Sequence, residues 1–250
     1  MIAPKFSKEA IARRFDSVAE AYDQNATAQS QIAHHLADIV ARKTPKSPAA
    51  ILDIGCGTGF VAEAVIERWP RADLTAVDSS LAMLRQAKRK LPHLRAVAGD
   101  ITAMEFGAEF DLILSSMALH WLAEPQAAIK HWQKWLKPGG RLFVAFLVAG
   151  SFAEWRDLCA SQGVSDSLWP LPEADFAAGL AAVIERRTVE TVHPSARDFL
   201  HNLKAMGGAT PRPGHKPIPV YAMRRLLRAA PKPFTASYNV LYLEMAAPPA

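Results

Sequence analysis

The sequence has few cysteines: Cys56 and Cys159 are the only two in 250 residues. Two cysteines form neither a disulfide framework nor a recognisable metal-ligand spacing, so a disulfide-rich secreted fold and a zinc-stabilised fold are both excluded. We expect no metal. Reduced thiols are typical of cytoplasmic proteins, and this is the compartment we expect.

Long hydrophobic runs are absent as well. The longest apolar run, LFVAFLV at residues 142–148, is far shorter than the roughly 20 residues needed to cross a bilayer. The segment MIAPKFSKEAIARRF at residues 1–15 is basic, but no apolar segment follows it, so we expect no secretory signal. The sequence therefore predicts a soluble protein without membrane contact.

Acidic residues are missing from one long stretch, since no Asp or Glu lies between Asp198 and Glu244. Across the whole chain, Lys and Arg exceed Asp and Glu by only 29 to 24, an excess too small to imply nucleic-acid binding. The basic residues of the acid-free stretch are Lys204, Arg212, Lys216, Arg224, Arg225, Arg228 and Lys232. Positive charge is therefore concentrated in this one region.

What the sequence does contain, after residue 48, is a regular alternation of short apolar runs with helical segments. The predicted strands are residues 49–54, 72–78, 94–100, 109–116 and 140–148. The predicted helices between them are residues 59–69, 81–90 and 125–136. Strands that alternate with helices form right-handed βαβ units. We therefore expect an α/β fold, a doubly wound parallel sheet with helices on both faces and a ligand crevice at the carboxyl ends of the strands.

The segments on either side of this core, residues 49–148, complete the expected architecture. Residues 1–48 show helical apolar spacing and are predicted to form an N-terminal cap. Beyond the core we expect helices near residues 151–162, 173–180, 195–205 and 219–229, and strands at 183–192 and 234–246. Residues 149–250 should supply lid helices and closing strands to the same domain, which gives a mostly parallel, seven-stranded sheet with an antiparallel last strand.

The turn ILDIGCGTGF at residues 51–60 places Gly55, Gly57 and Gly59 directly behind a predicted strand. Glycine adopts positive φ without steric cost and lets a ligand lie against the backbone. A strand, a glycine-rich turn and a helix N-terminus together present N–H groups to a ligand. The dinucleotide pattern G-x-G-x-x-G is not met, because Phe60 stands in the sixth place, so a pyrophosphate site is disfavoured.

Acidic residues flank this turn and end the next two predicted strands. Asp78 follows the turn by about twenty residues, where a carboxylate can accept hydrogen bonds from two ribose hydroxyls. Asp100 can accept from the exocyclic amine of adenine, with the backbone N–H of Ile101 donating beside it, and Asp53 can face an ammonium group. A strand-ending acid is also a common helix cap, but the ordered set favours S-adenosylmethionine as the ligand.

Residues 51–148 resemble the class I S-adenosylmethionine-dependent methyltransferases in the motifs DIGCGTG, VDSSLAML, AGDI, FDLILSSMALHW and WLKPGGRL. The resemblance implies that Ser79 and Met83 contact the cofactor, with Met83 packed against adenine, although Met83 alone would pass as a core residue. It also implies that residues from Ser115 onward line the methionine end of the cofactor, and that Tyr22 covers it. A helix tyrosine packed on the sheet would show the same spacing as Tyr22.

The flanking segments resemble the malonyl-acyl-carrier-protein O-methyltransferases of biotin synthesis. The similar segments are IARRFDSVAEAYDQNATAQSQIAHHL, LVAGSFAEW, LPEADFAAGL, ARDFLHNLKAMGGAT and SYNVLYLEM. The resemblance implies esterification of the free carboxylate of malonyl-acyl-carrier protein or malonyl-coenzyme A. A carboxylate with a pKa near 4 is already ionised at neutral pH, so we predict no general base and no catalytic proton carrier. Positioning and removal of water should supply the catalysis.

Candidate acceptor contacts lie outside the cofactor motifs. His120 and Trp121 follow the fourth predicted strand and are expected to bound the acceptor, although core packing would explain them equally well. Lys204 and Arg212 flank the segment AMGGATP, which suits a lid, and either can pair with the acceptor carboxylate. A solvated surface charge is the alternative for both.

Three arginines of the acid-free stretch are candidates for docking the acidic acyl carrier protein. Arg224, Arg225 and Arg228 fall on one predicted helix, with Arg224 and Arg228 on the same face. A basic surface speeds the encounter with an acidic partner, whereas a purely solvated helix face would have no such effect.

Four other functions stay open at this level. A methyltransferase for a free small carboxylic acid, such as trans-aconitate, needs no docking face for a carrier protein. A methyltransferase acting on RNA needs aromatic residues interleaved with basic ones, of which the basic region holds few. A non-catalytic S-adenosylmethionine-binding protein would bind without transfer, and a nucleotide-dependent dehydrogenase would need the missing sixth-place glycine.

Overall fold

The structure is a computed structural model that describes residues 8–208 and 217–247. Its strands are β1 (Ala50–Ile54), β2 (Asp73–Asp78), β3 (Arg95–Ala98), β4 (Phe110–Ser116), β5 (Leu136–Leu147), β6 (Ala182–His193) and β7 (Phe234–Ala246). Its helices are α1 (Lys8–Val18), α2 (Tyr22–Asn25), α3 (Thr27–Lys43), α4 (Phe60–Arg68), α5 (Leu81–Lys90), α6 (Pro125–Gln133), α7 (Ala153–Ser161), α8 (Ala196–Ala205) and α9 (Val220–Ala229), with a short 3-10 helix η1 (Leu119–Trp121).

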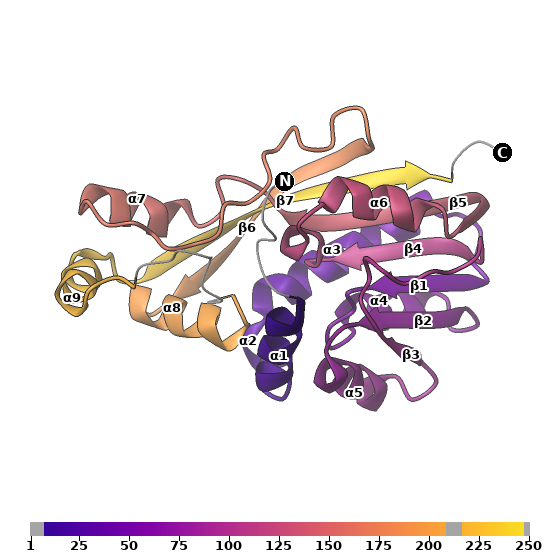
Figure 1. Cartoon of the computed structure of the whole chain (residues 1–250), viewed down its shortest axis with the longest axis horizontal. Coiled ribbons are helices and arrows are strands. Elements are labelled where there is room, and N and C mark those ends of the chain that lie inside the picture. The colour runs from indigo at the N-terminus through magenta and orange to yellow at the C-terminus, as the bar shows by residue number, and fades with distance from the viewer. Residues whose placement is uncertain (1–7, 209–216, 248–250) are drawn as a thin grey trace.

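The seven strands form one mixed sheet in the order β3-β2-β1-β4-β5-β7-β6 (Figure 1). Strands β1 to β5 pair in parallel, and β7 pairs antiparallel with both β5 and β6. The strand order reverses between β1 and β4, which is the place where open α/β sheets bind ligands. The predicted α/β architecture, with an antiparallel last strand, is confirmed.

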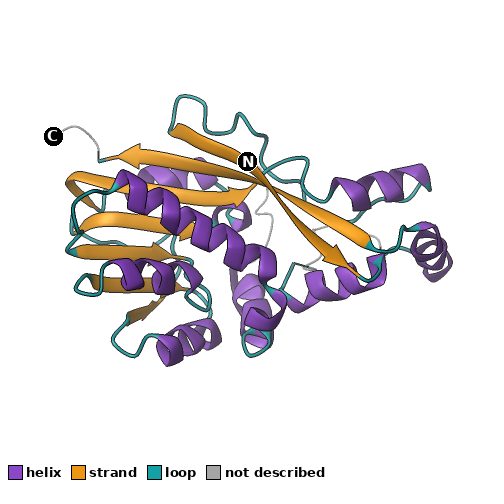
Figure 2. Cartoon of the chain, turned by 180° about the vertical axis from the view of Figure 1, so that it is seen from behind, coloured by secondary structure: helices purple, strands orange, loops and turns teal. Residues whose placement is uncertain are grey.

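Helices cover both faces of the sheet. The long helix α3 and helices α4 and α5 lie over one face (Figure 2), and α6 lies over the other (Figure 1). Each strand alternates between the two apolar cores, as the pleat requires: Ile51 faces the α3 side, while Leu52 and Ile54 face the α6 side with Trp132. This packing fixes where the carboxyl ends of the strands lie.

Strands β6 and β7 extend beyond the parallel part of the sheet. Strand β5 pairs with β7 only as far as Val240, so the first residues of β7 pair with β6 alone. Helices α7, α8 and α9 lie around this extension (Figure 1). The β6–β7 extension and helices α7, α8 and α9 therefore form a wall beyond the carboxyl ends of the parallel strands.

One predicted helix is wrong. Residues 173–180 form successive turns, in which Ala178 N donates to Asp175 O and Leu180 N donates to Ala177 O. A proline at 172 and a glycine with φ of +73° at 179 leave too short a segment for a helix. Elsewhere the predicted elements are found within a few residues. In the described parts of the chain, no helix has both the length and the apolarity required to cross a membrane.

Candidate functional site

A cavity of about 500 Å³ opens at the carboxyl ends of the parallel strands. The glycine turn after β1 and the ends of β2, β3 and β4 form its base. Residues of α1, α2 and α3 line it from the other side. Its position at the reversal of strand order is the one expected for a ligand of this fold.

The three glycines of the turn serve three different needs. A Cβ at Gly55 would lie 2.4 Å from the Cβ of Ala118, so no side chain fits there. A Cβ at Gly57 would meet nothing within 4 Å, which leaves open space for a ligand above the backbone. Gly59 does not line the cavity: its φ is +91°, and a Cβ would press on Ala87 of α5 at 3.3 Å. Its role in this structure is close helix packing.

Asp78 is held by the glycine turn itself. Its Oδ2 accepts a hydrogen bond from Gly57 N at 2.9 Å, and its Oδ1 accepts from Ser80 N at 2.8 Å. Burial raises the pKa of Asp78, while the hydrogen bonds from Ser80 and Gly57 oppose that rise. Each carboxylate oxygen keeps a second lone pair, so Asp78 can still accept from the two hydroxyls of a ribose.

Asp53 has one carboxyl oxygen without a partner among the described residues. It is 1% exposed, it lines the cavity, and its Oδ2 has no hydrogen-bond partner among the described residues. Burial, and then the nearby charge of Asp78, raise its pKa to about 7, although a backbone hydrogen bond at Ala62 opposes part of that rise. A buried carboxylate oxygen without a partner is costly. Together with the open space at Gly57, it fits the ammonium group of S-adenosylmethionine.

Asp100 is engaged by the N-terminal helix. Its Oδ1 accepts from Thr102 N at 2.9 Å, and its Oδ2 pairs with Lys8 Nζ of α1 at 2.5 Å. Burial acts in the opposite direction, but the hydrogen bonds from Lys8 and Thr102 lower its pKa. Asp100 and Ile101 both line the cavity, as predicted, and Asp100 is shared between the expected adenine site and α1.

Helix α1 closes the cavity by contacting both of its sides. Asp16 accepts hydrogen bonds from Ser80 Oγ and Ala82 N on the cofactor side. Arg14 donates to Lys204 O on the opposite side. Phe15 contacts the cavity between them, and its ring stacks edge-on against Trp121 at 5.6 Å. Sequence reasoning predicted a helical cap but not these individual contacts.

Three of the other four predicted cofactor contacts line the cavity. Tyr22, Ser79 and Met83 line the cavity. Ser115 does not, because its hydroxyl donates to Ile54 O inside the sheet. Ser116, the next residue along β4, lines the cavity instead, as alternation along a strand requires.

A smaller cavity of about 90 Å³ adjoins the first and shares part of its wall. The residues that line both are Phe15, Tyr22, Gln29, Met117 and Trp121. The residues that line only the smaller one are His120, Leu147, Phe152, Leu168, Trp169, Leu171, Leu203, Met206, Gly208 and Tyr238. The smaller cavity is therefore mostly apolar and aromatic, and none of the described residues lining it is acidic.

The predicted acceptor residues divide into two groups. His120 and Trp121, which were predicted to bound the acceptor, line the smaller cavity. Lys204 is exposed and lines neither cavity, although its neighbours Leu203 and Met206 do. Arg212 lies outside the described residues. The structure thus brings together two of the four predicted acceptor contacts.

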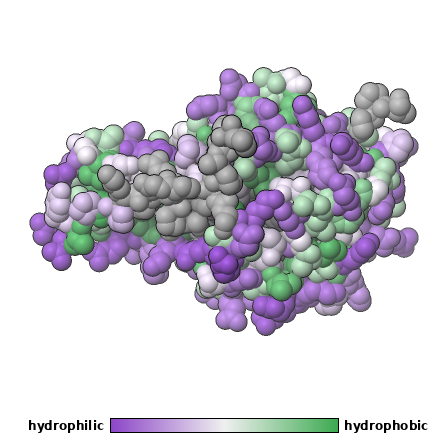
Figure 3. All heavy atoms as spheres, viewed as in Figure 1, coloured by the Kyte–Doolittle hydropathy of each residue, from purple (hydrophilic) through white to green (hydrophobic). Residues whose placement is uncertain are grey.

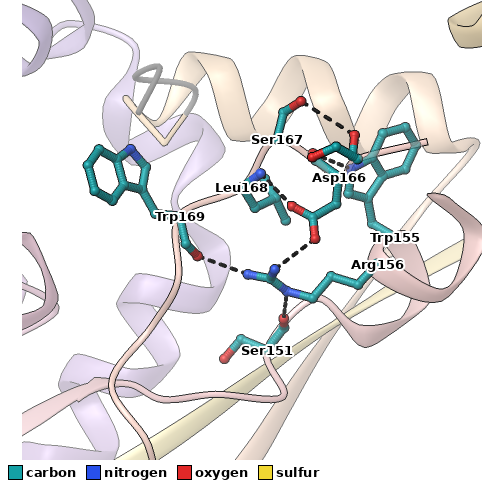
Figure 4. A network of polar contacts seen from close by, with 8 residues as sticks. Ser151, Trp155, Arg156, Asp166, Ser167, Leu168 and Trp169 are labelled. Carbon is teal, nitrogen blue, oxygen red and sulfur yellow. Dashed lines mark hydrogen bonds and ion pairs between the residues drawn. The ribbon is translucent and has the colours of Figure 1, made fainter. Parts of the chain in front are cut away.

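A polar network holds one wall of the smaller cavity (Figure 4). The guanidinium of Arg156 on α7 donates to Ser151 O, to Asp166 Oδ2 at 2.8 Å and to Trp169 O at 2.9 Å. Asp166 Oδ1 in turn accepts from Leu168 N at 2.6 Å. Leu168 and Trp169 both line the smaller cavity. Sequence reasoning missed this network, because its residues carry no motif.

The three predicted docking arginines lie together on α9. Arg224, Arg225 and Arg228 are all exposed, and Arg225 also donates to Gln162 O. Tyr221, which is 74% exposed, belongs to the same helix face. In Figure 3 polar residues predominate over the α9 end of the molecule, with small apolar patches among them. None of the three arginines lines either cavity.

No group of three or more His, Cys, Asp or Glu residues that could hold a metal is found within 8–208 and 217–247. Both Cys56 and Cys159 are free and buried.

Two protein families match parts of the chain. Residues 51–140 match the family described as Methyltransferase domain, and they contain the glycine turn, Asp78 and Asp100. Residues 148–244 match a family described as ER-bound oxygenase mpaB/B'/Rubber oxygenase, catalytic domain. The second match covers less than half of the chain and includes β6 and β7, which here complete the sheet begun by β1 to β5. It does not show membership of that family.

Solved structures share the fold. The YcgJ protein of Bacillus subtilis is 15% identical with a TM-score of 0.60, and the alignment covers 87% of this chain and 100% of that one. The plantazolicin methyltransferase BpumL, solved in complex with SAH, is 18% identical with a TM-score of 0.53, over 94% of each chain. At these identities the likeness concerns the fold alone.

Curated relatives extend beyond the cofactor motifs. The biotin biosynthesis bifunctional protein BioCD of Bordetella avium is 35% identical over 91% of this chain, but the chain spans only 50% of that protein. The malonyl-acyl-carrier-protein O-methyltransferase of Magnetococcus marinus is 31% identical over 88% of this chain and 86% of its own length. The enzyme of the same name from Herminiimonas arsenicoxydans is 34% identical over 84% of each. The chain belongs to the malonyl-acyl-carrier-protein O-methyltransferase family.

Proposed function

We propose that this chain transfers the methyl group of S-adenosylmethionine to the free carboxylate of malonyl-acyl-carrier protein, as a step of biotin synthesis. The observation that carries the proposal is the pair of adjoining cavities. The larger cavity has acidic residues in its floor, which suits a cationic cofactor. The described wall of the smaller cavity is mostly apolar and holds no acid, which suits an anionic acceptor. Relatives named malonyl-acyl-carrier-protein O-methyltransferase match 88% and 84% of the chain.

S-adenosylmethionine supplies an electrophilic methyl group on its sulfonium sulfur. An oxygen–carbon bond forms as the sulfur–carbon bond breaks, and the negative charge of the carboxylate disappears together with the positive charge of the sulfonium. No proton moves, because a carboxylate with a pKa near 4 is already ionised. The chain therefore needs to position the acceptor and exclude water rather than to accept a proton.

Residues of the chain divide this work between them. Asp53 and Asp78 hold the cofactor from below, and helix α1 covers it through Lys8 and Asp16. Tyr22 stays protonated, because burial and the charge of Asp78 raise its pKa well above the ordinary value. Tyr22 and Trp121 line both cavities at their shared wall, and their rings would keep water from the reacting groups.

The carrier protein would dock on helix α9. Acyl carrier proteins are acidic, and Arg224, Arg225 and Arg228 offer positive charge next to the exposed Tyr221. Lys204 and Arg212 stay candidates for a cationic partner of the acceptor, although Lys204 lines neither cavity and Arg212 lies outside the described residues. A cytoplasmic location agrees with two free, buried thiols.

The proposal is tested by a methyl-transfer assay with labelled S-adenosylmethionine and four acceptors: malonyl-acyl-carrier protein, malonyl-coenzyme A, trans-aconitate and bulk RNA. We expect transfer to both malonyl thioesters, faster to the carrier-bound one, and an ester product that releases methanol on mild alkaline treatment. Transfer to trans-aconitate alone would contradict the proposal and favour a free-acid methyltransferase.

A further inference from the structure

Gln29 occupies the wall that the two cavities share. It lies in the first turn of α3 and lines both the larger and the smaller cavity. The other four shared residues are Phe15, Tyr22, Met117 and Trp121. Gln29 is the one whose side chain ends in an amide, so it can both donate and accept hydrogen bonds at the passage between the cavities.

The side-chain amide of Gln29 has hydrogen-bonding capacity that the described residues do not use. Its Oε1 is buried and has no hydrogen-bond partner among the residues that the structure describes. A buried polar atom without a partner lowers stability, so its retention points to a ligand. Rotation of the amide by half a turn exchanges oxygen and NH₂, and the same position can then donate two hydrogen bonds.

The charges around the two cavities show which kind of ligand can reach Gln29 from each side. Asp53, Asp78, Asp100 and Glu124 line the larger cavity, whereas none of the described residues lining the smaller cavity is acidic. An anion is therefore repelled by the larger cavity and tolerated by the smaller one. An acceptor carboxylate that enters through the smaller cavity meets Gln29 at its inner end.

The described residues that line the two cavities offer no unengaged permanent cation to that carboxylate. Among the described lining residues of both cavities, Lys8 is the one side chain with a permanent positive charge, and it is held by Asp100 and Thr102. A cationic partner would stabilise the carboxylate most before reaction, because the charge of the carboxylate disappears as the ester forms. A neutral amide can orient the group with less of this ground-state stabilisation.

We propose that the side-chain amide of Gln29 holds the acceptor carboxylate at the passage between the two cavities and directs one of its oxygens toward the methyl group. This inference rests on the proposed function, since it assigns a residue to the acceptor of that reaction. Gln29 is thereby a contact that selects for a planar, anionic end group on the acceptor.

The test is steady-state kinetics of Gln29→Leu and Gln29→Asn with malonyl-coenzyme A, which removes any effect of carrier docking. Loss of a hydrogen bond to a charged group should raise KM for malonyl-coenzyme A about tenfold or more in Gln29→Leu. Gln29→Asn keeps the amide and should show a smaller rise. KM for S-adenosylmethionine and the affinity for S-adenosylhomocysteine should stay unchanged in both. Gln31→Leu, an exposed position on the same helix, is the matched control.

Gln29→Glu supplies a readout that a purely structural role would not move. At low pH the protonated glutamic acid can donate to the acceptor carboxylate, and at high pH the two anions repel each other. We expect KM for malonyl-coenzyme A to rise with pH in this variant and to stay flat in the native protein over the same range.

Three outcomes separate the possibilities. If Gln29→Leu weakens S-adenosylhomocysteine binding instead, the amide serves the cofactor and the inference is wrong. If the native protein methylates malonyl-coenzyme A and the Gln29 variants leave its KM unchanged, the inference alone is overturned. If the native protein methylates neither malonyl thioester, the proposed function falls and this inference with it.

Discussion

The two adjoining cavities are built from different kinds of residue. The larger one is based on backbone turns and carboxylates that end parallel strands, and its acids hold fixed positions through hydrogen bonds such as that from Gly57 N to Asp78. The smaller one is based on apolar and aromatic side chains from distant segments. Such a division of charge allows one molecule to bind a cation and an anion side by side. Among the described lining residues, the acids line the larger cavity alone, so an anion in the smaller cavity meets no acidic wall and is attracted by the cation next to it.

The largest effect should come from substituting Asp78, an acidic residue that lines the larger cavity. Asp78→Asn replaces an oxygen that accepts from a backbone N–H by an NH₂ that cannot. Loss of one backbone hydrogen bond and of the negative charge that accepts from the ribose hydroxyls should weaken S-adenosylhomocysteine binding about a hundredfold. Calorimetry measures this, and Asp73→Asn at the exposed start of the same strand is the control. An Asp78→Asn protein with a native circular dichroism spectrum and undiminished affinity would contradict the assignment.

The next largest effect concerns protonation of Asp53 in the larger cavity. Because the pKa of Asp53 is raised to about 7, the carboxyl is protonated below that pH and cannot pair with an ammonium. Affinity for S-adenosylmethionine should therefore rise about tenfold between about pH 6 and about pH 8 and then level off. Asp53→Asn should bind weakly and show a flat profile. A native profile that falls with rising pH would reverse the sign and exclude this role for Asp53.

The same shift has a consequence for stability. A carboxyl whose folded pKa is raised favours the unfolded state as it ionises, so the ligand-free protein should lose stability as the pH rises from about 4 to about 7. Asp53→Asn removes the ionisation, and its Tm should lack this part of the decrease. Thermal unfolding of the two proteins side by side measures the difference.

A smaller effect is expected on the apolar side. Arg156→Ala removes the two hydrogen bonds that fix the segment carrying Leu168 and Trp169, and a third to Ser151 O. KM for the malonyl thioester should rise about fivefold to tenfold, with KM for S-adenosylmethionine unchanged, because only the acceptor wall loosens. Arg156→Lys keeps the charge next to Asp166 and should recover part of the loss. Arg197→Ala, an exposed arginine on α8, is the control, and an equal rise of both KM values would show general destabilisation instead.

The smallest effect belongs to the outer surface. Reversing the charge of Arg224 and Arg228 should raise KM for malonyl-acyl-carrier protein about threefold to tenfold, while KM for malonyl-coenzyme A stays unchanged. High salt should reproduce the effect in the native protein. Charge reversal of Arg85 and Arg89 on α5, far from α9 in Figure 1, is the matched control. If both pairs slow transfer equally, net charge matters and docking on α9 does not.

The cofactor side could be predicted from the sequence because its physics is local. A strand that must turn sharply needs glycine at positive φ, and Gly55, Gly57 and Asp78 follow from that turn within one βαβ unit. Of the residues predicted from Ser115 onward, Ser116 and Met117 line the cavity and Ser115 does not, because the alternation along β4 decides which serine faces it. The prediction was also incomplete at Gly59, since contact with Ala87 depends on how two helices pack.

The acceptor side could not be predicted in the same way, because its wall is assembled from segments far apart in the chain. Gln29 on α3 and Trp169 after α7 meet only once the strands of the sheet are paired. Arg156 carries no motif, and its importance rests on where three carbonyl and carboxylate oxygens happen to converge. Lys204 satisfied every requirement of the sequence pattern and is nevertheless exposed outside both cavities.

The division of charge between the two cavities is tested most directly by binding, without turnover. Calorimetry would titrate S-adenosylhomocysteine, and then malonyl-coenzyme A in its presence, into the native protein, Asp78→Asn and Gln29→Leu. We predict that Asp78→Asn loses affinity for S-adenosylhomocysteine and that Gln29→Leu loses affinity for malonyl-coenzyme A alone. Loss of S-adenosylhomocysteine binding in Gln29→Leu, or malonyl-coenzyme A binding unchanged in that variant, would contradict this prediction.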